Sequence, residues 1–344
     1  MKRKQNSKAS PLRRCIAILC IVLSIIIIAV GVFFIVDRLR HADFYKNAHR
    51  EFIIPGLSEN FTPQGFDYLP EKDIYIMSGY MSDGTTSRIY VVDQTYTASD
   101  AIRIKNQDGS DHLSHSYGIS FYPGTDHVYL AGYGAIHRLS LTDLLDGDGE
   151  VTILADLKVL MQPAYCTVRG NSIYVGSFYY PKEYETPMGD RYITPAGDQN
   201  YALMAVYTLD PTSGDLLTGT HDALYSTCGM VQGMALADDD TLIFSTSWGL
   251  GTSHLYCYDL TAVDPSQAGE YTMPDGTKTP ILFLDSSCCY ADIAAPSMSE
   301  ELAVKDGRVF IMNEAACNKY FFGKLLGAQR LYSYPIPEKR PTND

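Results

Sequence analysis

The sequence predicts an all-β fold, a five-bladed β-propeller, preceded by one transmembrane helix. Three observations support this prediction: an uncharged apolar run near the N-terminus, a two-strand unit that recurs five times, and a composition with 26 Tyr and 27 Gly in 344 residues. Aromatic residues favour strands, and glycines scattered without a short period suit many tight turns. Hydrophobic residues make up 46% of the chain, which is too many for a disordered protein.

The apolar run, residues 15–36, is predicted to be a single-pass signal anchor in the cell membrane. Its 22 residues carry no charge, and as a helix they would span roughly 33 Å, against about 30 Å for a hydrocarbon core. Six Lys/Arg precede it, which predicts a cytoplasmic basic N-terminus (1–14) and an extracellular remainder. A cleaved signal peptide is the competing interpretation, although its apolar core usually has only about 7–15 residues. Residues 37–49 would then form a juxtamembrane linker.

Five repeats of a strand, a short polar turn and a second strand predict the propeller, residues 50–338. A third strand follows each repeat, and apolar segments at 102–106, 151–157, 222–226 and 281–285 are predicted as fourth strands. A single helical turn is expected at 142–145, and a C-terminal tail at 339–344. A β-sandwich does not explain the recurrence, and six or seven blades are the alternatives to five. The repeats begin at Gln64, Tyr117, Tyr165, Gln232 and Glu300.

The fifth repeat lacks an outer strand of its own, and this strand is predicted to come from the N-terminal end of the propeller sequence. Phe52, Ile53 and Ile54 lie just before the first repeat and are followed by Pro55 and Gly56. Pairing of this segment with the fifth repeat would close the ring and remove an exposed sheet edge.

Several short fragments follow one another in a recognisable order between residues 61 and 336. With them, the chain resembles bacterial secreted propellers of the broad quinoprotein-like and YVTN-like class. Relatives tend to read Glu-Gly where this chain has Glu300-Glu301. The resemblance implies the propeller fold and implies no reaction. The fragments are Pro63-Gln64-Gly65, Ala164-Tyr165-Cys166-Thr167, Val231-Gln232-Gly233-Met234-Ala235, Phe244-Ser245-Thr246-Ser247, Met298-Ser299-Glu300, and Asn313-Glu314-Ala315-Ala316 with Tyr320.

The charge of the chain argues against a nucleic-acid partner. Residues 41–344 carry 19 Lys/Arg and 39 Asp/Glu, a net charge of −20. Such a surface repels phosphate backbones, and no basic stripe interleaved with aromatic residues offsets it. The sequence instead predicts a partner at the cell surface or in the cell wall, and it leaves the oligomeric state open.

Six cysteines follow the apolar run, and the sequence leaves their pairing open. Their spacing matches no C-x-x-C metal pattern, and the chain is not dense enough in cysteine for a disulfide scaffold. Cys257 lies in a strand-like segment and is expected to be buried. The neighbours Cys288 and Cys289 are too close to bond to each other across a trans peptide. The others are Cys166, Cys228 and Cys317.

The candidate site lies at one end of the propeller axis, where long loops and the polar or aromatic ends of inner strands converge. No G-x-S-x-G, H-E-x-x-H or Walker-type motif is present. Glu300 and Glu314 are the candidate general acid and base, because Glu300 should begin an innermost strand and Glu314 should end the adjacent second strand. They could also bind a divalent metal such as Ca²⁺ with Asp67 and His115, or simply accept hydrogen bonds around the channel. The candidate ligand-binding residues are Gln64, Tyr80, His115, Tyr117, Tyr133, Tyr165, Gln232 and Trp248.

Two functions of different classes follow from this arrangement. The first is a membrane-anchored binding or scaffold module that recognises a glycan, peptide or protein on its loop-rich face, because loops and exposed aromatics commonly carry binding. The second is an extracellular hydrolase or lactonase-like enzyme that uses the acids at the channel mouth. The sequence favours the first function and predicts no cofactor, with Ca²⁺ as the exception in the second.

Overall fold

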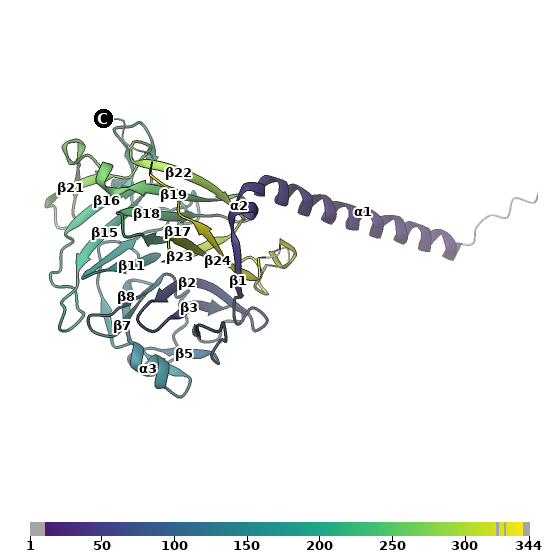
Figure 1. The fold of residues 1–344 in the computed structure, drawn as a ribbon, viewed down its shortest axis with the longest axis horizontal. Coiled ribbons are helices and arrows are strands. Elements are labelled where there is room, and N and C mark those ends of the chain that lie inside the picture. The colour runs from purple at the N-terminus through teal and green to yellow at the C-terminus, as the bar shows by residue number, and fades with distance from the viewer. Residues whose placement is uncertain (1–10, 321–322, 327, 340–344) are drawn as a thin grey trace, which may run out of the picture.

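The computed structural model describes residues 11–320, 323–326 and 328–339, and its sheets form the five blades of a propeller (Figure 1). Most of the expected cytoplasmic N-terminus (1–14) and C-terminal tail (339–344) lies outside the described residues. The innermost strand of each blade packs against the innermost strands of both neighbouring blades, so the ring is closed. These five strands are β2 (Phe61–Leu69), β6 (Ile119–Tyr122), β11 (Tyr165–Arg169), β17 (Val231–Leu236) and β23 (Ser299–Lys305).

Each blade is an antiparallel sheet that runs outward from its innermost strand. Blade 1 continues through β3 (Ile74–Met81), β4 (Arg88–Val92) and β5 (Ile102–Lys105). Blade 2 continues through β7 (His127–Gly132), β8 (Ala135–Ser140) and β10 (Ala155–Leu157). Blade 3 continues through β12 (Ser172–Gly176), β15 (Ala202–Thr208) and β16 (Ala223–Thr227). Blade 4 has β18 (Thr241–Thr246), β19 (Ser253–Asp259) and β22 (Cys289–Ala295), and blade 5 has β24 (Arg308–Asn313), β25 (Arg330–Pro335) and β1 (His49–Ile53).

The predicted outer strand of blade 4 is wrong. Residues 281–285 were expected there, whereas β22 is the strand that pairs with β19. Most of the expected segment belongs to β21 (Lys278–Phe283), which pairs in parallel with β16 of blade 3 and carries β20 (Gly269–Thr272) on its other edge. Ile281 is buried in the apolar cluster of blades 2 and 3, and this burial decides the partner of β21.

The outer strand of blade 2 differs from the prediction in a similar way. The segment 151–157 is divided between two blades, because β9 (Glu150–Thr152) pairs in parallel with β5 of blade 1 and only β10 joins blade 2. Two neighbouring blades are therefore joined through one short segment. The helical turn expected at 142–145 is confirmed as α3 (Leu141–Asp146), whose first turn is capped by the side chain of Ser140.

The predicted closure of the ring by the N-terminal strand is confirmed. Strand β1 pairs in antiparallel fashion with β25, and Arg50 lies opposite Tyr332 in the register. Phe52 and Ile54 are buried, and both belong to the apolar cluster that joins blade 5 to blade 1. The first residues of the propeller therefore complete its last blade.

Helix α1 (Pro11–Arg40) is long and apolar enough to cross a membrane, and none of its most apolar window is buried in the protein. It extends away from the propeller (Figure 1). The segment expected as a linker is ordered: it contains the end of α1, helix α2 (Ala42–Asn47) and the start of β1. Phe44 of α2 is buried and stacks on Tyr334 with ring centroids 5.4 Å apart.

The remaining short elements lie in the long loops. An insert in blade 3 contains the hairpin of β13 (Tyr192–Ile193) and β14 (Gln199–Asn200) together with the 3₁₀ turn η1 (Met188–Asp190). Further 3₁₀ turns are η2 (Leu260–Ala262), η3 (Pro265–Gln267) and η4 (Gly323–Leu326).

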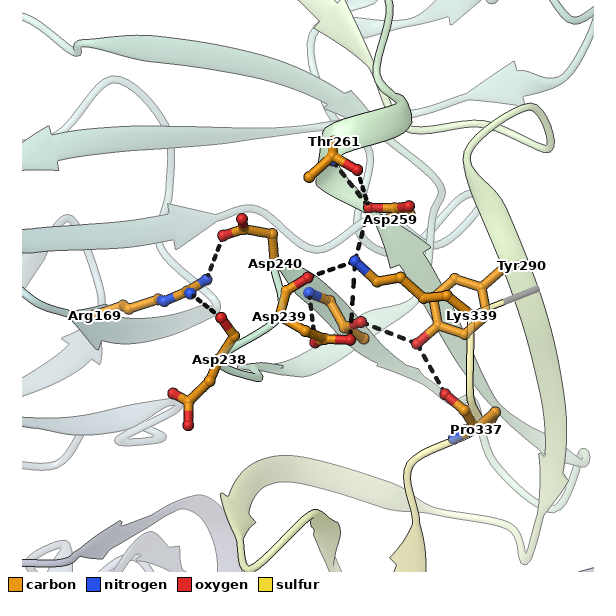
Figure 2. A network of polar contacts seen from close by, with 10 residues as sticks. Arg169, Asp238, Asp239, Asp240, Asp259, Thr261, Tyr290, Pro337 and Lys339 are labelled. Atoms are coloured by element: carbon orange, nitrogen blue, oxygen red, sulfur yellow. Dashed lines mark hydrogen bonds and ion pairs between the residues drawn. The ribbon is translucent and has the colours of Figure 1, made fainter. Parts of the chain in front are cut away.

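The end of the described chain is fixed beside the β17–β18 turn of blade 4 (Figure 2). This turn follows Leu236, at the end of β17 away from Gln232, so it lies at the opposite end of the inner strands from the candidate site. Lys339 donates to Asp259 Oδ1 at 2.8 Å, and Tyr290 donates to the carbonyl of Pro337 at 3.3 Å. On the other side of the same turn, Arg169 of blade 3 donates to Asp240 Oδ1 at 3.0 Å. These contacts fix the turns at this end of the propeller.

Candidate functional site

A pocket of about 260 Å³ lies where the predicted loops meet on the propeller axis. Eight of the ten residues predicted for binding or catalysis line it, and they come from the first, second, fourth and fifth repeats. These eight are Gln64, Tyr80, His115, Tyr117, Gln232, Trp248, Glu300 and Glu314. The rest of the lining consists of Gln162, Pro163, Ala164, Phe178, Tyr184, Lys319 and Tyr320.

The floor of the pocket is formed by inner-strand residues that are displaced from regular pairing. The ladder of β2 shifts register between Pro63 and Gly65, and the ladder of β17 shifts between Val231 and Gly233. The ladder of β23 shifts between Ser299 and Leu302. A β-bulge re-aims the side chain of the extra residue. Gln64, Gln232 and Glu300 occupy these bulges, and all three line the pocket.

Two predicted residues lie outside the pocket. Tyr165 is fully buried, because β11 is regular: it lies opposite Gly176, and its ring packs edge-on against Phe244 at 5.8 Å. Tyr133, in the β7–β8 turn, is 84% exposed and does not line the cavity. Neither residue is placed to share a ligand with the others.

Glu300 and Glu314 form a hydrogen-bonded carboxyl pair at the pocket floor, where they are only 3% and 8% exposed. Gln64 Nε2 donates to Glu314 Oε2 at 3.0 Å, and Tyr320 also binds the Glu314 carboxyl. Burial, and then the charge of Glu314, raise the pKa of Glu300 well above its usual range. Burial also raises the pKa of Glu314. Two carboxyls this close cannot both ionise, so the pair shares a proton near neutral pH.

Aromatic side chains form two walls above this floor. On one wall, His115 stacks on Tyr117 with centroids 5.2 Å apart and lies 4.4 Å from the ring of Tyr80. Burial, and then the charge of Lys319, lower the pKa of His115, so its imidazole is neutral at pH 7. On the other wall, Trp248 lies 5.9 Å from Phe178 and 5.6 Å from Tyr184.

Among the described residues of the pocket lining, Lys319 is the only lysine or arginine, and it lies at the Tyr80 wall. Its ammonium donates to the Tyr80 hydroxyl and lies 4.9 Å from the centre of that ring. Lys319, Gln162 and Tyr184 also line the pocket and were not among the residues predicted from the sequence. Their position in axial loops was the available signal, since 157–164, 178–200 and 314–328 all connect strands at this end of the propeller.

A further carboxyl, that of Glu301, lies on the axis one residue beyond the pocket floor. Its Oε1 accepts from the backbone N–H of Met234 at 2.5 Å, whereas its Oε2 has no hydrogen-bond partner among the described residues. Burial raises its pKa well above the usual range. Glu301 was not predicted as a site residue, although the aligned repeats have Gly65, Gly118 and Gly233 at the same position.

Of the four residues named for a metal site, His115, Glu300 and Glu314 line the pocket and Asp67 lies apart from them. Asp67 does not line the pocket; its Oδ2 accepts from Ser120 Oγ at 2.9 Å and from the N–H of Phe121 at 2.8 Å. Burial raises its pKa to about 6. Across the described part of the chain, no group of three or more His, Cys, Asp or Glu side chains could hold a metal ion. All eight cysteines, which lie within that part, are free thiols.

The comparisons with known proteins find solved structures of low similarity and assign no family. No protein-family model matches the chain, and no curated protein matches it. The PQQ-bound aldose sugar dehydrogenase from Streptomyces coelicolor is similar at 12% identity and a TM-score of 0.46, over 84% of this chain and 98% of that one. A gluconolactonase from Xanthomonas campestris has 15% identity and a TM-score of 0.38, over 84% and 95%. Glutaminyl cyclase from Myxococcus xanthus has 11% identity and a TM-score of 0.40, over 83% and 94%.

Proposed function

We propose that this chain is a membrane-anchored binding protein, with the propeller on the extracellular side and a small polar ligand in the axial pocket. The observation that carries the proposal is the set of three β-bulges that direct Gln64, Gln232 and Glu300 to one cavity. Each bulge disrupts the ladder locally, and such bulges are enriched next to functional sites. The six basic residues before the apolar run 15–36 support the proposed orientation.

The chemistry of the pocket favours a ligand with hydroxyl groups at its edges and a flat, weakly polar face. Amide groups and a proton-sharing carboxyl pair supply donors and acceptors at the floor, while aromatic rings line the walls. A volume of about 260 Å³ is close to the lower end for small-molecule sites. One sugar ring has this shape and these groups.

The test is a titration of the full chain, in detergent micelles, with monosaccharides and cell-wall glycan fragments. Trp248 is the only tryptophan of the chain and lines the pocket, so its fluorescence reports occupancy directly. Gln64→Ala should weaken binding roughly 5- to 30-fold. The variant removes one hydrogen bond between the Gln64 amide and the ligand, and such a bond contributes about 1–2 kcal/mol. Tyr133→Ala, outside the pocket, is the matched control. A ligand that binds equally to both variants would contradict the proposal.

A second candidate function is hydrolysis, with Glu300 and Glu314 as general acid and base. The observation that favours it is their shared proton, since one carboxyl is then protonated and the other ionised, as this chemistry needs. Glu300→Gln separates the two functions. An enzyme should lose turnover and retain binding, whereas a binding protein should change only in affinity.

A further inference from the structure

Two loops that border the pocket also contact the end of the apolar helix. Loop 247–252 carries Trp248 in the pocket and ends at Thr252, whose Oγ1 is hydrogen bonded to Nε2 of His41 at 3.2 Å. Loop 314–329 carries Lys319 in the pocket and contains η4, which lies against α1. In Figure 1 the yellow loop after β24 lies beside the base of α1. The pocket therefore opens on the side of the propeller from which α1 leaves.

The geometry of this junction limits how far the pocket lies from lipid. His41 follows the apolar run 15–36 by five residues, about 7 Å along a helix, and one headgroup layer is about 5–8 Å thick. Trp248 is four residues from Thr252, at most roughly 14 Å of extended chain. If α1 spans a bilayer, only the short segment 248–252 separates Trp248 from the junction with α1, so Trp248 lies close to the lipid headgroups.

The junction also holds the propeller in place on the helix. His41 is buried, and its Nδ1 lies 3.1 Å from Asp37 Oδ1 in the last turns of α1. One turn later, Phe44 packs between Tyr45, Tyr332 and Tyr334. Contacts on both sides of residue 41 therefore fix the direction in which the pocket faces relative to α1.

The charge of the two loops differs from that of the rest of the propeller. They carry Lys319 and Lys324, both exposed, and their single carboxyl is the buried Glu314. Arg38 and Arg40 lie in the last turn of α1, the helix that η4 contacts, whereas residues 41–344 as a whole carry a net charge of −20. Leu250, between Trp248 and Thr252, exposes about half of its surface. Basic residues with an exposed apolar side chain suit contact with an anionic lipid surface.

We propose that the pocket faces the membrane and that its ligand is the headgroup of an anionic phospholipid. The phosphate lies beside Lys319 at the mouth, because an ionised phosphate is repelled by the carboxyl pair deeper in the pocket. The hydroxyl-bearing end of the headgroup reaches Gln64 and Glu314 at the floor. This inference rests on the proposed function, since it names the ligand of the same pocket.

The orientation is tested by fluorescence of the full chain in nanodiscs of phosphatidylglycerol. A lipid with a nitroxide on its headgroup should quench the emission of Trp248 at least twofold. The matched control is the double variant Trp248→Phe, Leu217→Trp, which places the only tryptophan at an exposed site between β15 and β16. Its emission should not change. Equal quenching in the two proteins, or none in either, would overturn the proposal.

The ligand is tested by titrating the same protein, in phosphatidylcholine nanodiscs, with a short-chain, water-soluble phosphatidylglycerol. The emission of Trp248 should saturate, short-chain phosphatidylcholine should have no effect, and Lys319→Gln should weaken binding about tenfold. Lys278→Gln, an exposed lysine of β21, is the control. If phosphatidylglycerol fails while a soluble sugar binds in a Gln64-dependent manner, this inference is wrong and the proposed function stands. If neither binds, both are wrong.

Discussion

Substitution of Phe52 tests the seam at which the propeller closes. Phe52 belongs to β1, yet its ring packs on Tyr75 and Tyr96 of blade 1, with centroids 5.1 Å away in both cases. It is 4% exposed, whereas the next residue, Ile53, is 57% exposed. Side chains alternate between the faces of a strand, so two neighbouring residues provide a perturbation and its control in the same strand.

The expected effect of Phe52→Ala follows from its burial. Truncation of a buried phenylalanine costs about 3–5 kcal/mol, as lost transfer free energy and as a cavity. Unfolding entropy of about 2.1 cal/mol/K per residue, over the roughly 300 residues after α1, gives about 0.6 kcal/mol/K. The melting temperature should therefore fall by roughly 5–8 °C. Ile53→Ala should change it by less than about 1 °C, because surface substitutions usually cost under about 0.5 kcal/mol.

Thermal melts followed by circular dichroism, at matched protein and detergent concentrations, measure both variants. The difference between Phe52→Ala and Ile53→Ala is the informative quantity, since both shorten a side chain in the same strand. Equal melting temperatures for the two variants would refute the idea that β1 seals blade 5 against blade 1.

Two further predictions concern the axis. Burial raises the pKa of Glu301. The folded protein therefore keeps a proton on Glu301 that the unfolded chain releases above about pH 4.3. As a result, the free energy of unfolding falls as the pH rises from about 4.3 towards the raised pKa. Glu301→Gln should remove that contribution, up to about 1.4 kcal/mol per pH unit in urea melts at pH 5 and 7, and exposed Glu71→Gln should not. Gly233→Ala should destabilise the protein by about 1–3 kcal/mol or more, because its Cβ would lie 2.3 Å from Glu301 Cα. Gly189→Ala, with open space around it, should have little effect in the same thermal melts.

The ring was predictable from sequence because each repeat contains its own turn and alternation, whereas strand partners set by distant contacts were not. β22 reads CYADIAA, with small residues and an aspartate where an outer strand was not expected. The segment 281–285 is more apolar and was therefore predicted as the outer strand of blade 4. Most of this segment does form a strand, as part of β21. Its partner is β16 of blade 3, because Ile281 and Phe283 pack on that blade. Apolar pattern identifies strands, and tertiary burial assigns them to sheets.

The segment 37–49 shows the same limit. Its charged and polar residues are typical of a linker, and nothing within the segment indicates the contact of Phe44 with Tyr334, which lies 290 residues away. Because the rings of Phe44 and Tyr334 stack, the segment that was expected to be a linker is fixed to the propeller. The direction in which the pocket faces depends on this contact.

The floor of the pocket shows why equivalent positions in the repeats are not equivalent in space. Gln64, Tyr165 and Gln232 begin three of the repeats, yet Tyr165 points between blades, because β11 lacks the bulge that turns the other two towards the axis. The residue after each supplies the signal: Gly65 and Gly233 follow the two inward-facing glutamines, whereas Cys166 follows Tyr165. A Cβ at Gly65 would lie 2.2 Å from the carbonyl of Tyr117, so the bulged strand can approach its neighbour only with glycine there. Among these three repeats, glycine at this position accompanies a side chain that faces the pocket, whereas in the fifth repeat Glu300 faces the pocket although Glu301 follows it.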